Sequence, residues 1–188
     1  MKRVFVAIDI PLSARETVAR YIASLRLKFP GHRIGWERPE KLHLTLKFLG
    51  DVGDVTLGKI QAVLTKTAGE FEGFVFRIEG TGVFPDSRRP RVLWLGIDAG
   101  DPLKKIAKEL ELRFEKMGFP IDQRTFKPHL TIARVREPER SANVAEEHLR
   151  TEFRLESFEA SEIVLYQSVL APTGSEYTRL RSFAFRKI

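Results

Sequence analysis

Apolar and polar positions along the chain follow two periods, which predict strands and helices in an interspersed order. Segments rich in β-branched and aromatic residues predict strands over residues 3–10, 42–49, 74–78, 91–97, 129–135, 153–158, 162–170 and 177–185. Apolar residues at every third or fourth position predict helices over residues 13–29, 55–68, 101–117 and 142–149. Because several strands follow one another without a helix, the pattern favours an α+β fold with antiparallel sheets. No low-complexity linker divides the chain, so we expect residues 1–188 to form a single domain.

One short pattern occurs twice, as His43-Leu44-Thr45-Leu46 and as His129-Leu130-Thr131-Ile132, in a chain with only four histidines. In a strand, alternate side chains share a face, so each segment presents an imidazole and a hydroxyl on one side and two aliphatic side chains on the other. Two such segments related by an approximate two-fold axis bring their polar faces together across a groove. The repeat therefore predicts two lobes with a central groove, residues 43–46 contributing one wall and residues 129–132 the other.

The residue types of the repeat suit acid–base chemistry on a small anionic group. Histidine has an ordinary pKa of ~6.5, so both of its protonation states are accessible near neutrality. One imidazole can take a proton from water while the other gives a proton to a leaving alkoxide. The hydroxyls of Thr45 and Thr131 can donate hydrogen bonds to the non-bridging oxygens of a phosphodiester. We therefore expect His43, His129, Thr45 and Thr131 to be catalytic, although the spacing does not tell the two histidine roles apart.

Two other interpretations of the repeat stand beside this one. A single strand histidine is more often a core residue with its hydrogen bonds satisfied, but packing gives no reason to repeat histidine and threonine together. A zinc site is disfavoured because no second ligand follows either histidine at two to four residues. The other two histidines, His32 and His148, lack the pattern; we interpret both as bystanders and expect His148 to lie on a solvated helix.

Composition and charge narrow the chemistry and the partners. Cysteine is absent, which excludes disulfides, thiolate zinc sites and a cysteine nucleophile. Lysine and arginine number 32 against 25 acidic residues, a net charge of +7 that favours an anionic partner such as nucleic acid, although it also serves solubility alone. No stretch approaches the ~20 apolar residues of a membrane span, and no basic-then-apolar leader opens the chain. We expect no membrane association and a cytoplasmic location.

The sequence resembles the two-histidine (2H) phosphoesterases, and within them the RNA 2′,3′-cyclic phosphodiesterases, historically called 2′-5′ RNA ligases. The resemblance starts from the two repeats, which read HLTLKFLG from residue 43 and HLTIAR from residue 129. It extends to the opening segment 3–9, to residues 91–94 and to residues 168–174 with Tyr177, and so covers nearly the whole chain.

The resemblance implies a two-lobed α+β fold with pseudo-two-fold related antiparallel sheets, outer helices and an active groove between the lobes. It implies hydrolysis of RNA 2′,3′-cyclic phosphate ends to 2′-phosphomonoesters without metal or cofactor, and a slow reverse reaction that joins ends through a 2′-5′ bond. Carried over to this chain, His43 is the proton donor and His129 the proton acceptor. The expected partner is RNA with a 2′,3′-cyclic phosphate end, and we expect a monomer.

Five further residues are candidates for substrate binding: Arg134, Phe48, Tyr177, Ser168 and Arg91. The resemblance favours Arg134, since the family often has an arginine five residues after the second histidine, but strict alternation places it on the face opposite His129. Phe48 can stack on a base or pack in the core beside Leu46. Tyr177 and Ser168 rest on the resemblance alone.

Arg91 forms a basic cluster with Arg88 and Arg89, which can bind RNA phosphates or belong to a solvated loop.

Two alternative functions remain open. The same chemistry can act on a small cyclic nucleotide or a 2′-5′ oligoadenylate, and the groove can hold RNA ends without turning them over.

Overall fold

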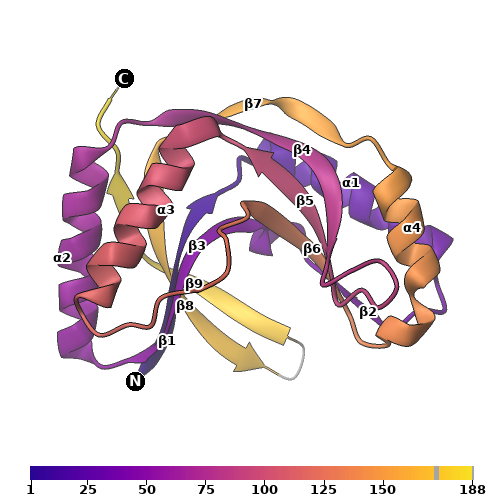
Figure 1. Cartoon of the computed structure of the whole chain (residues 1–188), viewed down its shortest axis with the longest axis horizontal. Helices are drawn as coiled ribbons and strands as arrows, with labels where there is room; N and C mark the ends of the chain where they lie inside the picture. The colour runs from indigo at the N-terminus through magenta and orange to yellow at the C-terminus, as the bar shows by residue number, and fades with distance from the viewer. Residues whose placement is uncertain (172–173, 188) are drawn as a thin grey trace.

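The computed structural model describes residues 1–171 and 174–187, which form two antiparallel β-sheets flanked by helices (Figure 1). The strands are β1 (Lys2–Asp9), β2 (Ile34–Trp36), β3 (His43–Val52), β4 (Phe74–Phe84), β5 (Val92–Asp98), β6 (His129–Val135), β7 (Arg154–Ala160), β8 (Glu162–Ala171) and β9 (Gly174–Ala184). The α-helices are α1 (Leu12–Lys28), α2 (Asp54–Glu70), α3 (Gly100–Glu115) and α4 (Ala142–Arg150). The expected α+β fold with antiparallel sheets and two lobes is confirmed.

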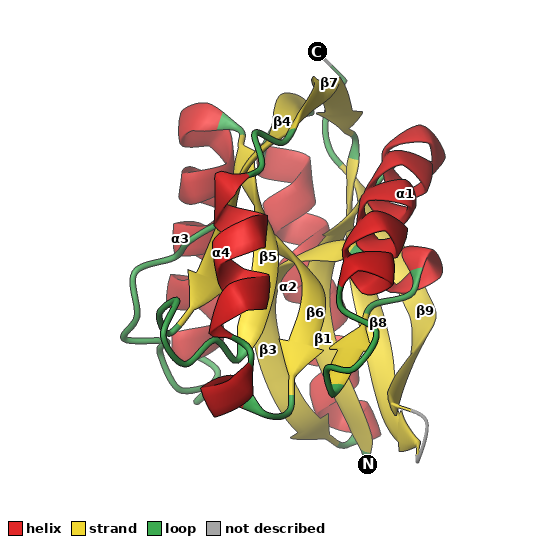
Figure 2. Cartoon of the chain, turned by 90° about the vertical axis from the view of Figure 1, so that its right-hand side faces the viewer, coloured by secondary structure: helices red, strands yellow, loops and turns green. Residues whose placement is uncertain are grey.

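Each sheet carries one copy of the repeated tetrapeptide at the start of a strand. The first sheet has the order β3-β1-β8-β9, and the second has the order β2-β6-β5-β4-β7. Helices α2 and α3 lie outside the first sheet, and α1 and α4 lie beside the second (Figures 1 and 2). Strands β3 and β6, which begin at His43 and His129, lie against each other where the two sheets meet.

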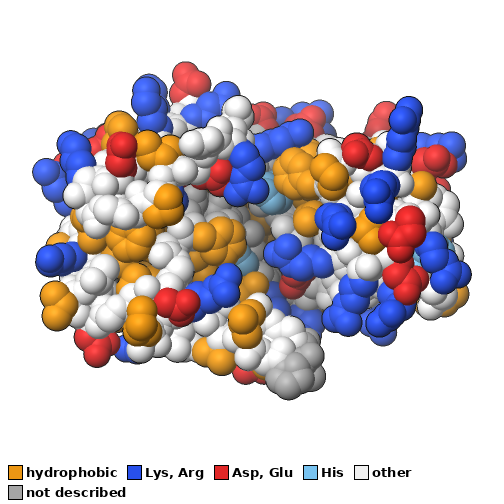
Figure 3. Space-filling model, turned by 60° about the horizontal axis from the view of Figure 1, so that its bottom comes forward, with side chains coloured by type: hydrophobic (Ala, Val, Ile, Leu, Met, Phe, Trp, Pro, Cys, Tyr) orange, Lys and Arg blue, Asp and Glu red, His pale blue; other side chains and the backbone are white. Residues whose placement is uncertain are grey.

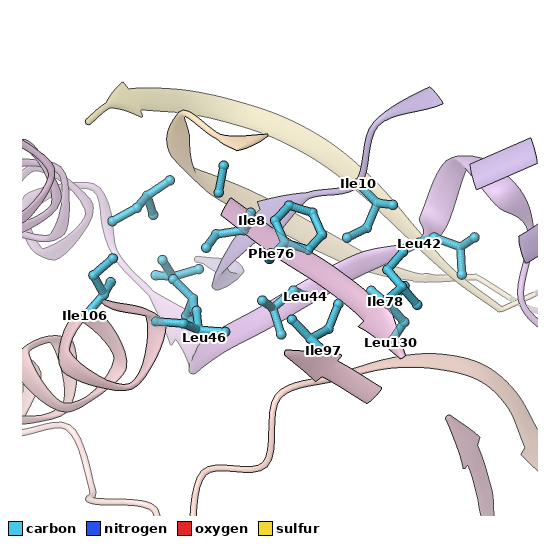
Figure 4. Close-up of a cluster of buried hydrophobic side chains, with 14 of the residues drawn as sticks. Ile8, Ile10, Leu42, Leu44, Leu46, Phe76, Ile78, Ile97, Ile106 and Leu130 are labelled. Atoms are coloured by element: carbon cyan, nitrogen blue, oxygen red, sulfur yellow. The ribbon is translucent and has the colours of Figure 1, made fainter. Parts of the chain in front are cut away.

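The aliphatic side chains of the repeats hold the two sheets together. Leu44, Leu46, Leu130 and Ile132 are buried in one apolar cluster that includes residues of both sheets. In Figure 4, Leu44 and Leu46 of β3 lie in the same cluster as Leu130 of β6 and residues of β4 and β5. Burial of these residues on one face leaves the histidine and threonine of each repeat on the other.

Two parts of the fold differ from the sequence-based expectation. Strand β2 was not predicted, because a three-residue strand is too short to show a period. Strand β4 continues to Phe84 rather than ending at residue 78, because Gly80 and Gly82 interrupt its apolar pattern. The remaining elements agree to within a few residues at their ends.

Among the residues that the structure describes, none of the helices combines the length and the apolar character needed to cross a bilayer.

His148 is buried, and the expectation of a solvated position is wrong. Its Nδ1 lies 2.7 Å from the Tyr21 hydroxyl, and its Nε2 lies 3.0 Å and 3.2 Å from the carbonyl oxygens of Trp94 and Gly82. Nε2–H therefore donates to the two carbonyls, and Nδ1 accepts from the tyrosine. Helix α4 is amphipathic, and His148 is on its buried face with Val144 and Ala145.

Candidate active site

The two repeats orient their imidazoles by the same local device. Nδ1 of His43 lies 2.6 Å from the carbonyl oxygen of Lys41, and Nδ1 of His129 lies 2.6 Å from the carbonyl oxygen of Lys127. In both cases the acceptor is two residues before the histidine. Because a carbonyl can only accept, the proton of the neutral imidazole is on Nδ1, and Nε2 carries the lone pair used for chemistry.

A β-bulge follows each threonine and changes which side chains face the groove. Ala7 pairs with Thr45 while the next residue back, Val6, pairs with Lys47, so Leu46 is the extra residue. In the second sheet, Trp94 pairs with Thr131 and Leu93 pairs with Ala133, so Ile132 is the extra residue. A bulge shifts the alternation by one position. The two strands consequently have the same burial pattern over their first seven residues.

The bulges place Phe48 and Arg134 on the same face as the histidines. Strict alternation put Arg134 on the opposite face, and that expectation is wrong because it did not include the bulge. Phe48 is 64% exposed, so the interpretation that it packs in the core beside Leu46 is also wrong. The residue that turns inward instead is Lys47, which is 7% exposed and donates to the carbonyl oxygen of Pro120 at 2.7 Å.

In the first lobe, the His43 imidazole is surrounded by aromatic rings. The Phe5 ring lies 4.8 Å from the imidazole and stacks on Tyr166 at 5.3 Å. Tyr177 meets His43 edge-on at 5.2 Å, and Phe48 lies 5.5 Å from Phe5. His43, Tyr166 and Tyr177 line a cavity of about 340 Å³, and its other lining residues are Arg38, Glu40, Lys41, Leu42 and Glu176. Tyr177 therefore borders the His43 imidazole, and its contact with the substrate stays a prediction.

In the second lobe, His129 is held against two aromatic side chains and a lysine. Phe84 meets the imidazole edge-on at 5.1 Å, and Trp94 lies 6.0 Å from it. The Lys127 ammonium sits 4.6 Å above the Trp94 ring, a cation–π contact. Figure 3 shows histidine side chains within a hollow of this face, with lysine and arginine side chains around it.

The charged neighbours of the two histidines differ. Burial lowers the pKa of both imidazoles, and the bonds to the backbone carbonyls oppose this. Asp9, which faces His43 across the β1–β3 pair, raises the pKa of His43, while Arg134 and Arg15 lower it. The charges acting on His129, Arg134 and Lys127, both lower its pKa. Arg134 therefore lowers the pKa of both histidines.

Arg134 is held from one side by Glu37. Its Nε lies 3.5 Å from Oε1 of Glu37, whose side chain is 19% exposed against 59% for the arginine. The backbone N–H of Glu37 donates to the Ile132 carbonyl, which fixes the chain just after β2 against the bulge of β6. Burial raises the pKa of the Glu37 carboxyl, and Arg134 and Lys41 lower it. This contact engages Nε and leaves the two terminal nitrogens of the guanidinium for an anion.

The other predicted binding residues lie farther from the histidines. Ser168 is half-buried in β8, opposite Arg3 of β1 and Tyr177 of β9. Arg91 is exposed immediately before β5, next to Val92, the partner of Arg134. Two residues of the segment 168–174, Pro172 and Thr173, lie outside the described residues.

Several residues of the site were missed by sequence reasoning: Phe5, Asp9, Glu37, Lys41, Tyr166, Phe84, Trp94 and Lys127. Phe5 and Asp9 carried a usable signal. They alternate with Val4, Val6 and Ile8 in β1, so they share the face opposite the core. Lys41 and Lys127 carried a signal too, because each stands two residues before a repeat histidine, so both copies of the repeat read Lys-x-His-Leu-Thr. Glu37, Tyr166, Phe84 and Trp94 come from outside the repeats, and no local pattern marks them.

Comparisons with known proteins agree with this geometry. Residues 14–170 match a family model described as the 2′-5′ RNA ligase superfamily. A relative from Methanothermobacter thermautotrophicus, named RNA 2′,3′-cyclic phosphodiesterase, is 37% identical over 184 residues, 96% of this chain and 97% of the relative. A relative of the same name from Archaeoglobus fulgidus is 35% identical over 96% of this chain and 99% of its own length.

Solved structures show the same similarity over the whole chain. The protein TT0787 of Thermus thermophilus superposes with a TM-score of 0.82 at 27% identity, covering 98% of each chain. E. coli LigT in complex with 3′-AMP superposes with a TM-score of 0.77 at 27% identity, also covering 98% of each chain.

Proposed function

The chain belongs to the 2′-5′ RNA ligase superfamily, and from this premise we propose that it hydrolyses RNA 2′,3′-cyclic phosphate ends to 2′-phosphomonoesters by two-histidine acid–base catalysis. The observation that carries the proposal is the paired orientation of the imidazoles. Both bond a carbonyl through Nδ1 at 2.6 Å and so use Nε2 for proton transfer. The names of the relatives supply the substrate class, which the geometry by itself does not.

The charged neighbours support different roles for the two histidines. We assign His43 as the acid, because a general acid must carry a proton and Asp9 favours the protonated form of His43 against the opposing effects of Arg134 and Arg15. His129 is the base, because Lys127 and Arg134 both favour its neutral form. This assignment agrees with the family roles expected from the sequence.

The reaction is a single displacement at phosphorus. His129 Nε2 takes a proton from a water molecule as the water oxygen bonds to phosphorus, and the bond from phosphorus to the 3′ oxygen breaks. His43 Nε2–H gives its proton to that oxygen, which leaves as the 3′-hydroxyl, and the phosphate remains on the 2′ oxygen. Proton exchange with solvent then restores both histidines.

Thr45 and Thr131 stabilise the charge that develops during this step. Each hydroxyl is on the face of its histidine, two residues along the strand, and donates to a non-bridging oxygen. Arg134 acts on both histidines and adds a positive charge beside the phosphate. When the 5′-hydroxyl of a second RNA replaces water as the nucleophile, the same displacement joins the two ends through a 2′-5′ bond.

The aromatic residues of the first lobe bind the terminal nucleoside. Phe48 offers an exposed ring on which a base can stack, and Tyr177 borders the His43 imidazole. Ser168 lies beyond Tyr177 in the same sheet, and Arg91 lies beyond Arg134 in the other. These two residues contact the sugar and the adjoining phosphate.

The test is an incubation of the purified chain, in excess EDTA, with an oligoribonucleotide that ends in a 2′,3′-cyclic phosphate. The product is identified by mass and by enzymatic mapping of its end. A 2′-phosphate is expected, and its rate of formation must fall at least a hundredfold in His43→Ala and in His129→Ala. A 3′-phosphate would reverse the orientation of the substrate. Binding without product would favour an RNA-end-binding protein, and turnover only of a cyclic mononucleotide or a 2′-5′ oligoadenylate would favour a small substrate.

A further inference from the structure

Three strand ends of the second sheet bring arginines together beside the catalytic groove. The N–H of Val135 donates to the carbonyl of Arg91 at 2.9 Å, and the N–H of Arg136 donates to the carbonyl of Arg33 at 3.0 Å. The start of β5, the end of β6 and the residue before β2 therefore lie side by side. Neighbouring strands are ~4.8 Å apart, so the three arginines form a row across the end of the sheet.

The loop from β4 to β5 adds two arginines to this row. Oδ1 of Asp86 accepts the backbone N–H groups of Arg88 and Arg89 at 2.9 Å and 3.1 Å, and both arginine side chains are exposed. The loop begins after Phe84, whose ring contacts His129, and it closes through the Arg91 N–H bonded to the Phe84 carbonyl at 2.7 Å. We call the full set the arginine edge: Arg33, Arg88, Arg89, Arg91 and Arg136.

The arginine edge joins the catalytic centre directly. Arg134 lies two residues before Arg136 in β6 and pairs with Val92, which follows Arg91. Acidic side chains offset part of the charge, since Glu137 lies 3.3 Å from Arg33 and Glu37 lies 3.5 Å from Arg134. The arginines still outnumber the carboxylates. Figure 3 shows blue side chains gathered over the half that holds β2 and the ends of β5 and β6.

The residue type also separates this edge from an ordinary solvated surface. Its cations are all arginines, whose planar forks bind phosphate oxygens in pairs. The exposed cations at the start of α3 are instead lysines, Lys104, Lys105 and Lys108, followed by acidic residues on the same helix. The first lobe offers the complementary surface, the exposed aromatic ring of Phe48.

We propose that the RNA chain preceding the cyclic phosphate leaves the groove past Arg134 and runs over the arginine edge, so that the protein binds upstream phosphodiesters and prefers RNA oligomers to mononucleotides. The inference rests on the proposed function. The terminal base lies toward the aromatic first lobe, and the anionic backbone lies toward the second lobe.

The experiment compares a ten-nucleotide RNA ending in a 2′,3′-cyclic phosphate with the cyclic mononucleotide of the same terminal base, between 50 and 300 mM KCl. The expected KM for the decamer is at least tenfold lower, and it rises more steeply with salt. In the triple variant Arg88→Gln/Arg89→Gln/Arg136→Gln, we expect the ratio of the two KM values to fall at least tenfold. The slope of log KM against log salt for the decamer should also decrease by about 0.7 for each phosphate that the variant no longer binds.

The control is Lys104→Gln/Lys105→Gln/Lys108→Gln, which removes the same charge from α3 and should keep the wild-type ratio. Equal KM values for decamer and mononucleotide in the wild type would overturn the inference, as would the same response in both triple variants. Fluorescence anisotropy of a labelled decamer on the same three proteins decides the question independently of turnover. A wild type that binds the decamer through the arginine edge but turns over neither substrate would contradict the proposed function alone.

Discussion

Phe48 and Arg134 occupy equivalent positions in the two lobes. Each lies five residues after the histidine of its repeat, and each reaches the histidine's face because a bulge follows the threonine. The two repeats thus build the same scaffold and place an aromatic ring on one and a guanidinium on the other. This difference makes the groove asymmetric, so a substrate with a base at one end and phosphates at the other fits it in one orientation.

We expect Phe48→Ala to weaken substrate binding without weakening the fold. Stacking of a base on an aromatic side chain contributes ~1–3 kcal/mol, so KM for a cyclic phosphate substrate should rise between about 5-fold and 150-fold with kcat little changed. Because Phe48 is 64% exposed, the free energy of unfolding should change by less than about 0.5 kcal/mol.

Steady-state kinetics and urea unfolding of the same preparations measure both effects. Leu27→Ala removes an apolar side chain on α1 that is more exposed still, at 81%, and should leave KM unchanged. A large loss of stability in Phe48→Ala with normal KM would show that the ring serves packing and not the substrate.

Arg134→Gln should instead lower kcat. Removing one group that stabilises developing charge typically costs ~10²–10³ in kcat, and the Arg134 charge acts on both histidines. Arg134→Lys should recover only part of this loss, because Glu37 engages Nε and a lysine lacks the planar fork. Single-turnover rates with both variants test the expectation, and full recovery with lysine would mean that only the net charge matters.

The faces of β3 and β6 show how far the sequence determines the site. Alternation along the repeats correctly separated His43, Thr45, His129 and Thr131 from the buried aliphatic residues, because two-residue periodicity is local. The bulges were not predictable by the same rule. A bulge depends on how a strand pairs with its neighbour, and the neighbour of Thr45 is Ala7, far away in the sequence.

Glu37 and His148 were beyond reach for a related reason. Glu37 meets Arg134 only because the short strand β2 pairs with β6, and a three-residue strand leaves no period. His148 is surrounded by acidic and basic residues in the sequence, which suggested a solvated helix, yet the helix turns that one position toward Gly82 and Trp94. In both cases the partners come from tertiary packing.

The pH dependence of kcat/KM should be bell-shaped, with both limbs below the ordinary pKa of histidine. Activity requires neutral His129 and protonated His43, so the acid limb reports His129 and the alkaline limb reports His43. Burial lowers both pKa values, which moves both limbs toward acid. Binding of the dianionic product or an anionic analogue should raise the pKa of His43 in the complex, because the negative charge favours the protonated imidazole.

Single variants separate the two limbs. Proton transfer typically contributes ~10²–10⁴, so His43→Ala and His129→Ala should each lose at least a hundredfold in rate. The residual activity of His43→Ala should lose its alkaline limb, and that of His129→Ala should lose its acid limb. The opposite pattern would exchange the roles assigned to the two histidines.

Gly82→Ala should disturb the wall behind His129. A β-carbon at Gly82 would lie 2.0 Å from the ring of Trp94, which contacts the His129 imidazole, so the indole must move. We expect a destabilisation of ~1–3 kcal/mol, as for other overpacked cores, together with a lower kcat. Gly58→Ala is the matched control: it lies inside α2 with open space around it and should stabilise the helix by up to ~1 kcal/mol. Normal kcat in Gly82→Ala would show that Trp94 does not position His129.

Acid should destabilise the protein partly through His148. Burial lowers the pKa of this imidazole, so the folded state holds it neutral while the unfolded chain binds a proton. Its contribution to stability is therefore complete above the unfolded pKa of ~6.5 and is lost as the pH falls below that value toward the folded pKa. The loss amounts to at most about 1.4 kcal/mol per pH unit for each additional proton bound by the unfolded chain. His43 and His129 act in the same direction.

His148→Gln isolates this contribution from those of the catalytic histidines. At pH 7.5 the variant should be ~1–3 kcal/mol less stable, because the bonds to Tyr21, Gly82 and Trp94 are disturbed. Between pH 7.5 and pH 5 its stability should fall less steeply than that of the wild type, since one proton-binding group is gone. Urea unfolding at several pH values measures both slopes. Parallel slopes would mean that a group other than His148 causes the acid sensitivity, and that the buried imidazole serves packing alone.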